Sequence, residues 1–346
     1  MKALLFPGQG SQSVGMCRDF YDKFDRVKKL FQNADDILNI KLSNLILKGP
    51  QDQLKLTENT QPAILLVSYS IFIIMKEEYG FNLNSCKYFA GHSLGEYSAL
   101  VCSGSLKFDD ALKLVKLRGK AMQESVPVGK GAMLAILGSE ISEIEKNIEE
   151  IKKDSNLICE IANDNADGQV IVSGEIEIIE KLKNFLKSKK IKSILLPVSA
   201  PFHSSMMKDA EKIMFEKIMN TNFLNPQIEI ISNVDAKPNK DKDIIKKLLV
   251  DQICSRVRWR ESILNMKKSG INEYIEIGPG KVLSGMIKRI TKNVDSKNIK
   301  IARMMLRIEN QALNPKLSCI PDKSGNINIQ IITPKKCAEM VPTKNG

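Results

Sequence analysis

A serine lies between two glycines in residues 91–95, which read GHSLG. An apolar, strand-like run at 87–90 precedes it, and a helix-forming run at 96–101 follows it. A Gly-x-Ser-x-Gly sequence between a strand and a helix is a nucleophile elbow, a sharp turn that exposes the serine oxygen at the carboxyl end of a sheet. The following helix directs its free N–H groups and its positive dipole end at the same place. We therefore predict that Ser93 is a nucleophile and that the Leu94 N–H stabilises an oxyanion.

A serine nucleophile needs a base, and the whole chain contains only two histidines. His92 directly precedes the serine. Because neighbouring side chains at a strand end point in opposite directions, its ring is expected to face away from the serine oxygen. His203 follows the last strand of a predicted inserted domain, where the chain returns toward the elbow. We predict that His203 is the base and that His92 is a structural or site-lining residue.

Two other glycine-rich stretches fail the nucleotide-binding patterns. FPGQGSQ, at 6–12, follows the first predicted strand, but Ser13 occupies the third glycine position of the dinucleotide fingerprint. GPGK, at 278–281, does not fit the frame of a phosphate-binding loop. The first stretch has another use, because Gln9 lies between two glycines and offers a backbone N–H as a second oxyanion donor.

The composition limits the class of protein. The 346 residues are 43% hydrophobic, which suits about two domains with buried cores. The longest apolar stretch, 64–75, is shorter than the roughly 20 residues of a membrane-spanning helix, and the N-terminus has no signal-peptide pattern. We expect a cytoplasmic protein that does not bind membranes. The seven cysteines include no CxxC pair, so we expect neither disulfides nor a metal site.

The net charge of +12 suggests an acidic partner. Part of the excess is local, because residues 281–303 hold seven Lys and Arg against one Asp. Aromatic residues make up only 5% of the chain and do not alternate with this basic stretch, which disfavours nucleic acid as the partner. A docking surface for an acidic protein and a set of solvated lysines explain the charge about equally well.

The segment 127–199 has its own pattern of elements. Its order is β-α-β-β-α-β, the pattern of a ferredoxin-like unit, and we predict that it is a small domain inserted into a larger one. The expected strands are 132–137, 157–162, 169–173 and 191–198, the expected helices are 139–153 and 175–189, and the turn-rich NDNADG at 163–168 joins the middle strands.

The flanking segments, 1–126 and 200–305, form the larger predicted domain. Short apolar strands alternate with helical stretches, as a mostly parallel α/β sheet requires. The expected strands are 2–6, 88–90, 227–232 and 273–277. The tail, 306–346, is different, because it is rich in proline and has no helical period. We predict that the tail is disordered or forms a small hairpin, and we assign it no function.

Seven motifs, in chain order, resemble those of the bacterial malonyl-CoA:acyl carrier protein transacylases of type II fatty acid synthesis. The resemblance covers about residues 1–303. It implies a hydrolase-like α/β core with an inserted ferredoxin-like subdomain, in agreement with the element order above. The motifs are FPGQGSQ, TENTQPAI, GHSLGEYSAL, KLRGKAMQ, NDNADGQVIVSG, VSAPFHSSM and EIGPGKVLSGM.

The resemblance implies a role for each matching residue. Ser93 would carry the malonyl group as an ester, His203 would act as general base and acid, and the backbone N–H groups of Gln9 and Leu94 would form the oxyanion hole. Gln252 would orient His203 through its backbone carbonyl, so that no carboxylate completes a triad.

The resemblance also implies an acyl pocket. Arg118 would pair with the malonyl carboxylate, because its guanidinium matches a carboxylate bidentately. The residue type at Phe202 is the one that the family shows with malonyl rather than branched units. Other residues would line the site: Gln61, His92, Asn163 and Asn165. Asp167 stands where relatives often have proline, so the sequence does not fix the path of that loop.

Three functions follow as hypotheses. The first is ping-pong transfer of malonyl from malonyl-CoA to the phosphopantetheine thiol of an acidic acyl carrier protein, by a monomer without metal or redox cofactor. The second is an α/β serine hydrolase or thioesterase for a small carboxylated acyl substrate. The third is a basic binding module that docks an acidic protein without catalysis.

Overall fold

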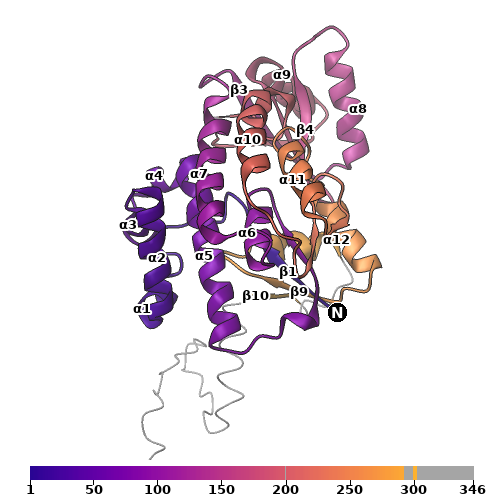
Figure 1. The fold of residues 1–346 in the computed structure, drawn as a ribbon. Coiled ribbons are helices and arrows are strands. Elements are labelled where there is room, and N and C mark those ends of the chain that lie inside the picture. The colour runs from indigo at the N-terminus through magenta and orange to yellow at the C-terminus, as the bar shows by residue number, and fades with distance from the viewer. Residues whose placement is uncertain (199, 292–298, 302–346) are drawn as a thin grey trace, which may run out of the picture. The chain divides into compact units, whose positions relative to one another are not determined.

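A six-stranded sheet, in the order β10-β9-β1-β2-β7-β8, forms the centre of the structure (Figure 1). This computed structural model describes residues 1–198, 200–291 and 299–301. Neighbouring strands run parallel except β8, which is antiparallel to β7. The strands are β1 (Lys2–Phe6), β2 (Cys86–Gly91), β7 (Glu229–Ile231), β8 (Pro238–Asn239), β9 (Glu273–Glu276) and β10 (Ile299–Ile301).

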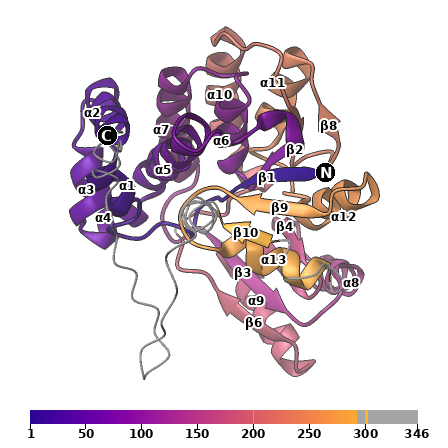
Figure 2. The ribbon, with the colours of Figure 1, turned by 90° about the horizontal axis from the view of Figure 1, so that it is seen from below.

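Helices cover both faces of this sheet (Figure 2). Because side chains alternate along a strand, Leu4 and Phe6 of β1 belong to one apolar cluster, and Ala3 and Leu5 to another. The first cluster includes residues of α5, α6, α7 and α10, and the second includes residues of α12 and α13. The helices around this sheet are α1 (Arg18–Lys23), α2 (Asp25–Leu38), α3 (Leu42–Lys48), α4 (Gln51–Lys55), α5 (Thr57–Glu77), α6 (Gly95–Cys102), α7 (Phe108–Glu124), α10 (Lys208–Asn220), α11 (Lys242–Asp251), α12 (Trp259–Lys268) and α13 (Val282–Ile290).

A second, antiparallel sheet has the order β4-β5-β3-β6. One face packs with its two helices into a separate apolar core. Residues from the other face, such as Met133 and Ile171, belong to the main core. The elements are β3 (Gly131–Leu137), α8 (Ile141–Lys152), β4 (Cys159–Ala166), β5 (Gln169–Glu175), α9 (Ile176–Ser188) and β6 (Lys192–Leu195).

The predicted fold class is confirmed: a mostly parallel α/β sheet accompanies a β-α-β-β-α-β unit. One prediction within this unit is wrong. Residues 163–166 were expected in a turn, but β4 continues through them to Ala166 with two register shifts against β5. Polar residues remain in the strand there because the parallel contact of Asn163 with Val257 supplies backbone hydrogen bonds. The short strands β8 and β10 were not predicted.

The predicted domain boundaries stay a prediction. The second sheet lies between Gly131 and Leu195, inside the range 127–199. Both sheets belong to one compact unit, Met1–Leu306. The expectation for the tail, 306–346, falls outside the described residues.

Candidate active site

Ser93 lies on a sharp turn between the end of β2 and the start of α6. Its φ angle is +53°, a left-handed conformation that a serine rarely adopts. The Asn233 side chain holds this turn from both sides. Its Oδ1 accepts a hydrogen bond from the Ser93 N–H at 2.7 Å, and its Nδ2 donates to the Gly91 carbonyl at 2.7 Å. The strained turn is therefore fixed by an amide from the neighbouring β7 strand end.

We expect Gly91→Ala to destabilise the protein by at least about 2 kcal/mol, because there is no room for a methyl group in the turn. A Cβ on Gly91 would lie 1.9 Å from the carbonyl carbon and oxygen of Gly95. Gly285→Ala is the matched control, since a Cβ there meets nothing within 4 Å and alanine favours the helix α13. Chemical denaturation measures both. Equal stability of the two variants would contradict the packing described for the turn.

His203 faces the serine from the segment after β6. Its Nε2 lies 2.8 Å from the Ser93 Oγ, and its Nδ1 lies 2.9 Å from the backbone carbonyl of Gln252. A carbonyl only accepts, so Nδ1 carries the hydrogen and Nε2 is free to accept from the serine hydroxyl. Burial, with a smaller contribution from the Arg118 charge, lowers the pKa of His203 to about 3. The ring is therefore neutral at pH 7, as a base must be.

Arg118 places a buried cation beside the serine. Its side chain, on α7, is 1% exposed and donates to the amide oxygens of Gln61 and Gln252 at 2.8 and 2.9 Å. It also donates to the Ser93 Oγ at 3.1 Å. A Cβ on Gly119 would lie 2.6 Å from the backbone at the start of α5, so this glycine allows the two helices to approach closely. Among the ion pairs of the described residues, none involves Arg118.

His92 points away from the serine oxygen. Its Nε2 lies 2.8 Å from Asn165 Oδ1 of β4, and its ring packs 5.6 Å from the Trp259 ring. Burial lowers the pKa of His92. The two histidines thus lie in different surroundings, and of the two it is His203 that contacts the Ser93 hydroxyl.

The other predicted site residues lie in different parts of the fold. The side chain of Gln9 donates to Thr57 Oγ1 at 3.2 Å, and both residues line a cavity of about 520 Å³ whose opposite wall comes from the second sheet. Neither the Gln9 nor the Leu94 backbone N–H donates a hydrogen bond to a backbone carbonyl of the described residues. Asn163 is buried on β4 without a side-chain hydrogen bond to any described residue. Phe202 is buried in the main core.

Two residues at the site were missed by the sequence analysis. Asn233 lies two residues after the end of β7, and polar side chains after parallel strands commonly meet at a site, which is a usable signal. Glu96 lies on α6 and is fully buried between Asn233 and Gln252. Its signal is a carboxylate directly before the mostly apolar run 97–102 of a short helix.

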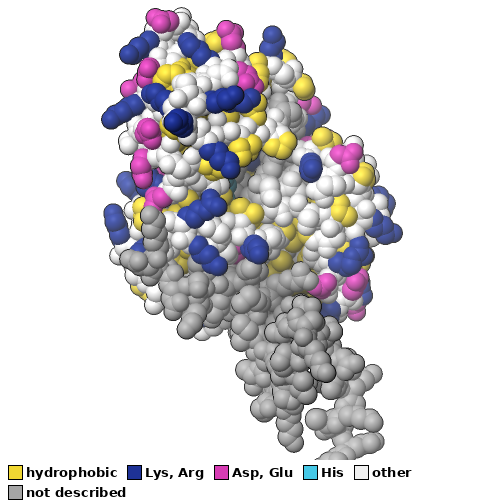
Figure 3. All heavy atoms as spheres, turned by 180° about the vertical axis from the view of Figure 1, so that it is seen from behind, with side chains coloured by type: hydrophobic (Ala, Val, Ile, Leu, Met, Phe, Trp, Pro, Cys, Tyr) yellow, Lys and Arg dark blue, Asp and Glu magenta, His cyan; other side chains and the backbone are white. Residues whose placement is uncertain are grey.

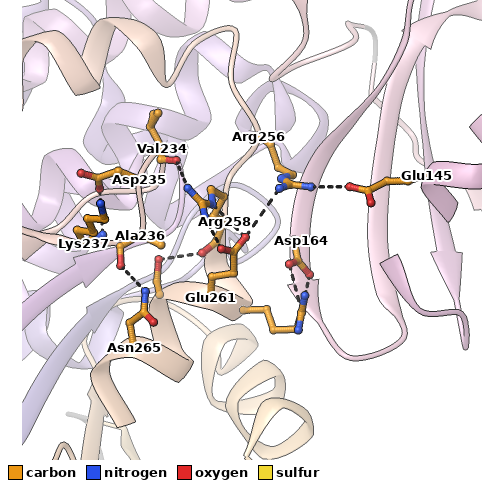
Figure 4. Close-up of polar contacts among 12 residues, drawn as sticks. Glu145, Asp164, Val234, Asp235, Ala236, Lys237, Arg256, Arg258, Glu261 and Asn265 are labelled. Atoms are coloured by element: carbon orange, nitrogen blue, oxygen red, sulfur yellow. Dashed lines mark hydrogen bonds and ion pairs between the residues drawn. The ribbon is translucent and has the colours of Figure 1, made fainter. Parts of the chain in front are cut away.

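Ion pairs join the segment around the start of α12 to the second sheet (Figure 4). Arg256 Nη1 lies 3.2 Å from Glu145 of α8. Arg260 Nε lies 2.9 Å from Asp164 of β4, and its Nη1 lies 3.7 Å from Asp167. The Arg260–Asp164 pair lies on the same strand as Asn165, the residue that contacts His92.

Part of the predicted basic stretch lies at the surface. Of the predicted basic stretch, Lys281, Lys288 and Arg289 are exposed on or beside α13, and Arg289 donates to Gln169 at 2.7 Å. Figure 3 shows basic side chains scattered over one face with acidic ones among them.

In the described ranges, no helix has the length and apolar character to cross a membrane, and no three His, Cys, Asp or Glu side chains are grouped to hold a metal ion.

Comparisons with known proteins point to one family. The sequence matches the acyl transferase domain family over residues 3–319. It is 40% identical over 315 residues to the malonyl CoA-acyl carrier protein transacylase of Bacillus subtilis (strain 168), a match that covers 89% of this chain and 98% of that protein.

Solved structures agree. The acyl-carrier-protein S-malonyltransferase from Bartonella henselae matches with a TM-score of 0.84 at 39% identity, covering 89% of this chain and 99% of that one. A malonyl-transacylase solved in complex with its type II PKS acyl-carrier protein matches with a TM-score of 0.83 at 37% identity, covering 89% and 99%. The chain therefore belongs to the malonyl-CoA:acyl carrier protein transacylase family.

Proposed function

We propose that this protein transfers a malonyl group from malonyl-CoA to the phosphopantetheine thiol of an acyl carrier protein. His203 removes the Ser93 proton, the serine oxygen attacks the thioester carbonyl, and CoA leaves as the thiol after protonation. The carrier thiol then attacks the malonyl ester in the reverse sense, which restores the free serine. The N–H groups of Gln9 and Leu94 stabilise the negative oxygen formed in each step.

The buried guanidinium of Arg118 is the observation that carries this proposal. It lies next to the nucleophile, and its described hydrogen-bond partners are the neutral groups of Gln61, Gln252 and Ser93. A buried cation with no carboxylate hydrogen-bonded to it among the described residues suits an acyl substrate that brings its own carboxylate. A hydrolase for uncharged esters has no need of such a charge. Site-lining roles for His92, Asn163, Asn165 and Phe202 remain part of the proposal.

Incubation with malonyl-CoA, followed by intact mass measurement, tests the first half of the reaction. We expect one malonyl adduct per chain, and its loss when phosphopantetheinylated carrier protein is added, with malonyl appearing on the carrier. Release of free malonate at the same rate without carrier would instead favour the hydrolase. Binding of the carrier without any adduct would favour the non-catalytic module.

Arg118→Ala should weaken malonyl transfer by about 2–5 kcal/mol in kcat/KM, the size expected for a charged hydrogen-bonded pair. Acetyl transfer should suffer less, because an acetyl group has no carboxylate. Arg118→Lys should restore only part of the activity, since the planar fork is lost. Lys120→Ala is the control, because Lys120 is exposed on the same helix. Equal losses with malonyl and acetyl substrates would assign Arg118 to folding.

The proposal includes the setting of the reaction. The carrier is an acidic protein that docks transiently, as the relative solved with its acyl-carrier protein supports, and the net charge of +12 favours such a partner. We propose that the enzyme works as a cytoplasmic monomer, without metal or cofactor, and without nucleic acid or membrane partners.

A further inference from the structure

Glu96 is a buried carboxylate to which the proposed transfer assigns no role. It lies on α6, three residues after Ser93, and is 0% exposed. Its Oε2 accepts a hydrogen bond from the Asn233 backbone N–H at 3.0 Å and another from Gln252 Nε2 at 2.8 Å. The carboxylate therefore reaches two residues that themselves contact the reacting groups.

The Gln252 carboxamide lies between Glu96 and Arg118. Its Nε2 donates to Glu96, and its Oε1 accepts from Arg118 Nη2 at 2.9 Å. An ionised carboxylate only accepts and a guanidinium only donates, so an amide between them has one orientation that satisfies both. The other acceptors near Nε2, the Ser93 carbonyl and Asn233 Oδ1, are more distant at 3.2 and 3.3 Å.

We infer that Glu96 is a positioning residue for the malonyl pocket: it fixes the Gln252 amide so that the amide oxygen holds the Arg118 guanidinium toward the substrate carboxylate. This inference rests on the malonyl transfer proposed above and names one determinant of its acyl specificity. The backbone carbonyl of Gln252 separately holds His203, so one residue serves the base through its backbone and the acyl pocket through its side chain.

The Glu96 carboxylate does not stabilise the folded protein at neutral to alkaline pH, so stability does not explain its burial at this position. Burial, with a small contribution from nearby Asp235, raises the pKa of Glu96 from 4.5 to about 7, against the lowering effect of the hydrogen bonds from Asn233 and Gln252. A carboxyl group with a raised pKa in the folded state contributes stability that is fully present below about pH 4.5 and is lost as the pH rises through about 7. The Glu96 charge is one of the contributions that raise the pKa of Arg118, on α7, against the larger lowering caused by burial. At pH 8 the ionised group thus lowers the stability of the fold, and a role in the site accounts for it better.

Two conservative variants of Glu96 distinguish the effect of its side-chain length from the effect of its charge. Glu96→Asp keeps the charge but is one methylene shorter, so it withdraws the acceptor from Gln252. Glu96→Gln keeps the reach and an acceptor oxygen but removes the charge. We expect Glu96→Asp to lower malonyl kcat/KM at least about 10-fold and acetyl kcat/KM by less than about 3-fold. We expect Glu96→Gln to stay within about 3-fold of wild type with both substrates, and to unfold at no lower temperature at pH 8.

A double-mutant cycle tests whether Glu96 acts through Gln252. Gln252→Met removes the amide and leaves the backbone carbonyl in place, so it should give the same malonyl-selective loss. In the double variant Glu96→Asp with Gln252→Met, malonyl kcat/KM should match that of Gln252→Met alone within about 2-fold, because the amide through which Glu96 acts is absent.

Three results would overturn the inference: equal losses of malonyl and acetyl transfer in Glu96→Asp, a larger loss in Glu96→Gln than in Glu96→Asp, or losses that multiply in the double variant. The first result would mean that Glu96 supports the turn at Ser93 through Asn233. The second would mean that Glu96 acts through its negative charge rather than through its hydrogen bond to Gln252. The wild-type enzyme keeps the two proposals apart. If wild type forms no malonyl adduct, the proposed function fails, whereas a normal wild-type reaction with unselective variants defeats only the role of Glu96.

Discussion

Ser93→Ala is expected to abolish the malonyl adduct and to lower transfer at least about 10³-fold, because no other described hydroxyl contacts the His203 ring. The Ser93 Oγ lies between His203 Nε2 and the Arg118 guanidinium, so the variant loses the atom that carries the acyl group. Intact mass after incubation with malonyl-CoA measures the adduct directly.

Ser98→Ala is the matched control for this variant. Ser98 lies on the helix that begins at the elbow, is fully buried, and has no hydrogen-bond partner for its hydroxyl among the described residues. Its loss should therefore leave both the adduct and the stability nearly unchanged. An adduct that survives in Ser93→Ala at full stoichiometry would remove the serine from the mechanism.

His203→Ala is expected to slow both half-reactions by about 10²–10⁴-fold, the usual contribution of a general base. The ring is neutral at pH 7, since its pKa is lowered to about 3, and its Nε2 lies 2.8 Å from the serine oxygen. Single-turnover acylation by malonyl-CoA and deacylation by carrier protein measure the two steps separately. A similar slowing of both would reflect one residue that acts as base and then as acid.

His92→Ala provides the comparison within the same chain. Its ring contacts Asn165 and Trp259 rather than the serine hydroxyl, so its loss should act mainly through packing and reduce the rate less. If His92→Ala is the slower of the two variants in acylation, the assignment of the base must be exchanged.

Much of the fold was predictable because local patterns and the fold agree. The strand before Ser93 and the helix after it are short and apolar, and both form close to their predicted bounds. The extension of β4 through Asn163 and Asn165 was not predictable, since asparagine, aspartate and glycine favour turns. Pairing with β5 and the contact with Val257 outweigh that preference, and Val257 lies too far along the chain to be visible in local sequence.

The site was predictable where a choice was narrow. Two histidines and one elbow left few alternatives for the contact between Ser93 and His203, and the resemblance supplied Arg118 and the Gln252 carbonyl. Asn233 and Glu96 were missed because their importance depends on contacts across 137 residues of chain. Periodicity and spacing in the sequence indicate which residues are neighbours within one helix or strand. The contact between Glu96 and Asn233 joins two different elements, so these patterns do not reveal it.

The order of these residues along the chain has a consequence for biosynthesis. The serine and the guanidinium come before the segment that forms the second sheet, whereas His203 and Gln252 come after it. A growing polypeptide that ends at residue 200 contains the proposed acyl acceptor and the buried cation but lacks the proposed base. The proposed mechanism therefore requires that translation pass Gln252 and that the last helices dock before the enzyme can consume malonyl-CoA, so it predicts that activity arises only with a nearly complete fold.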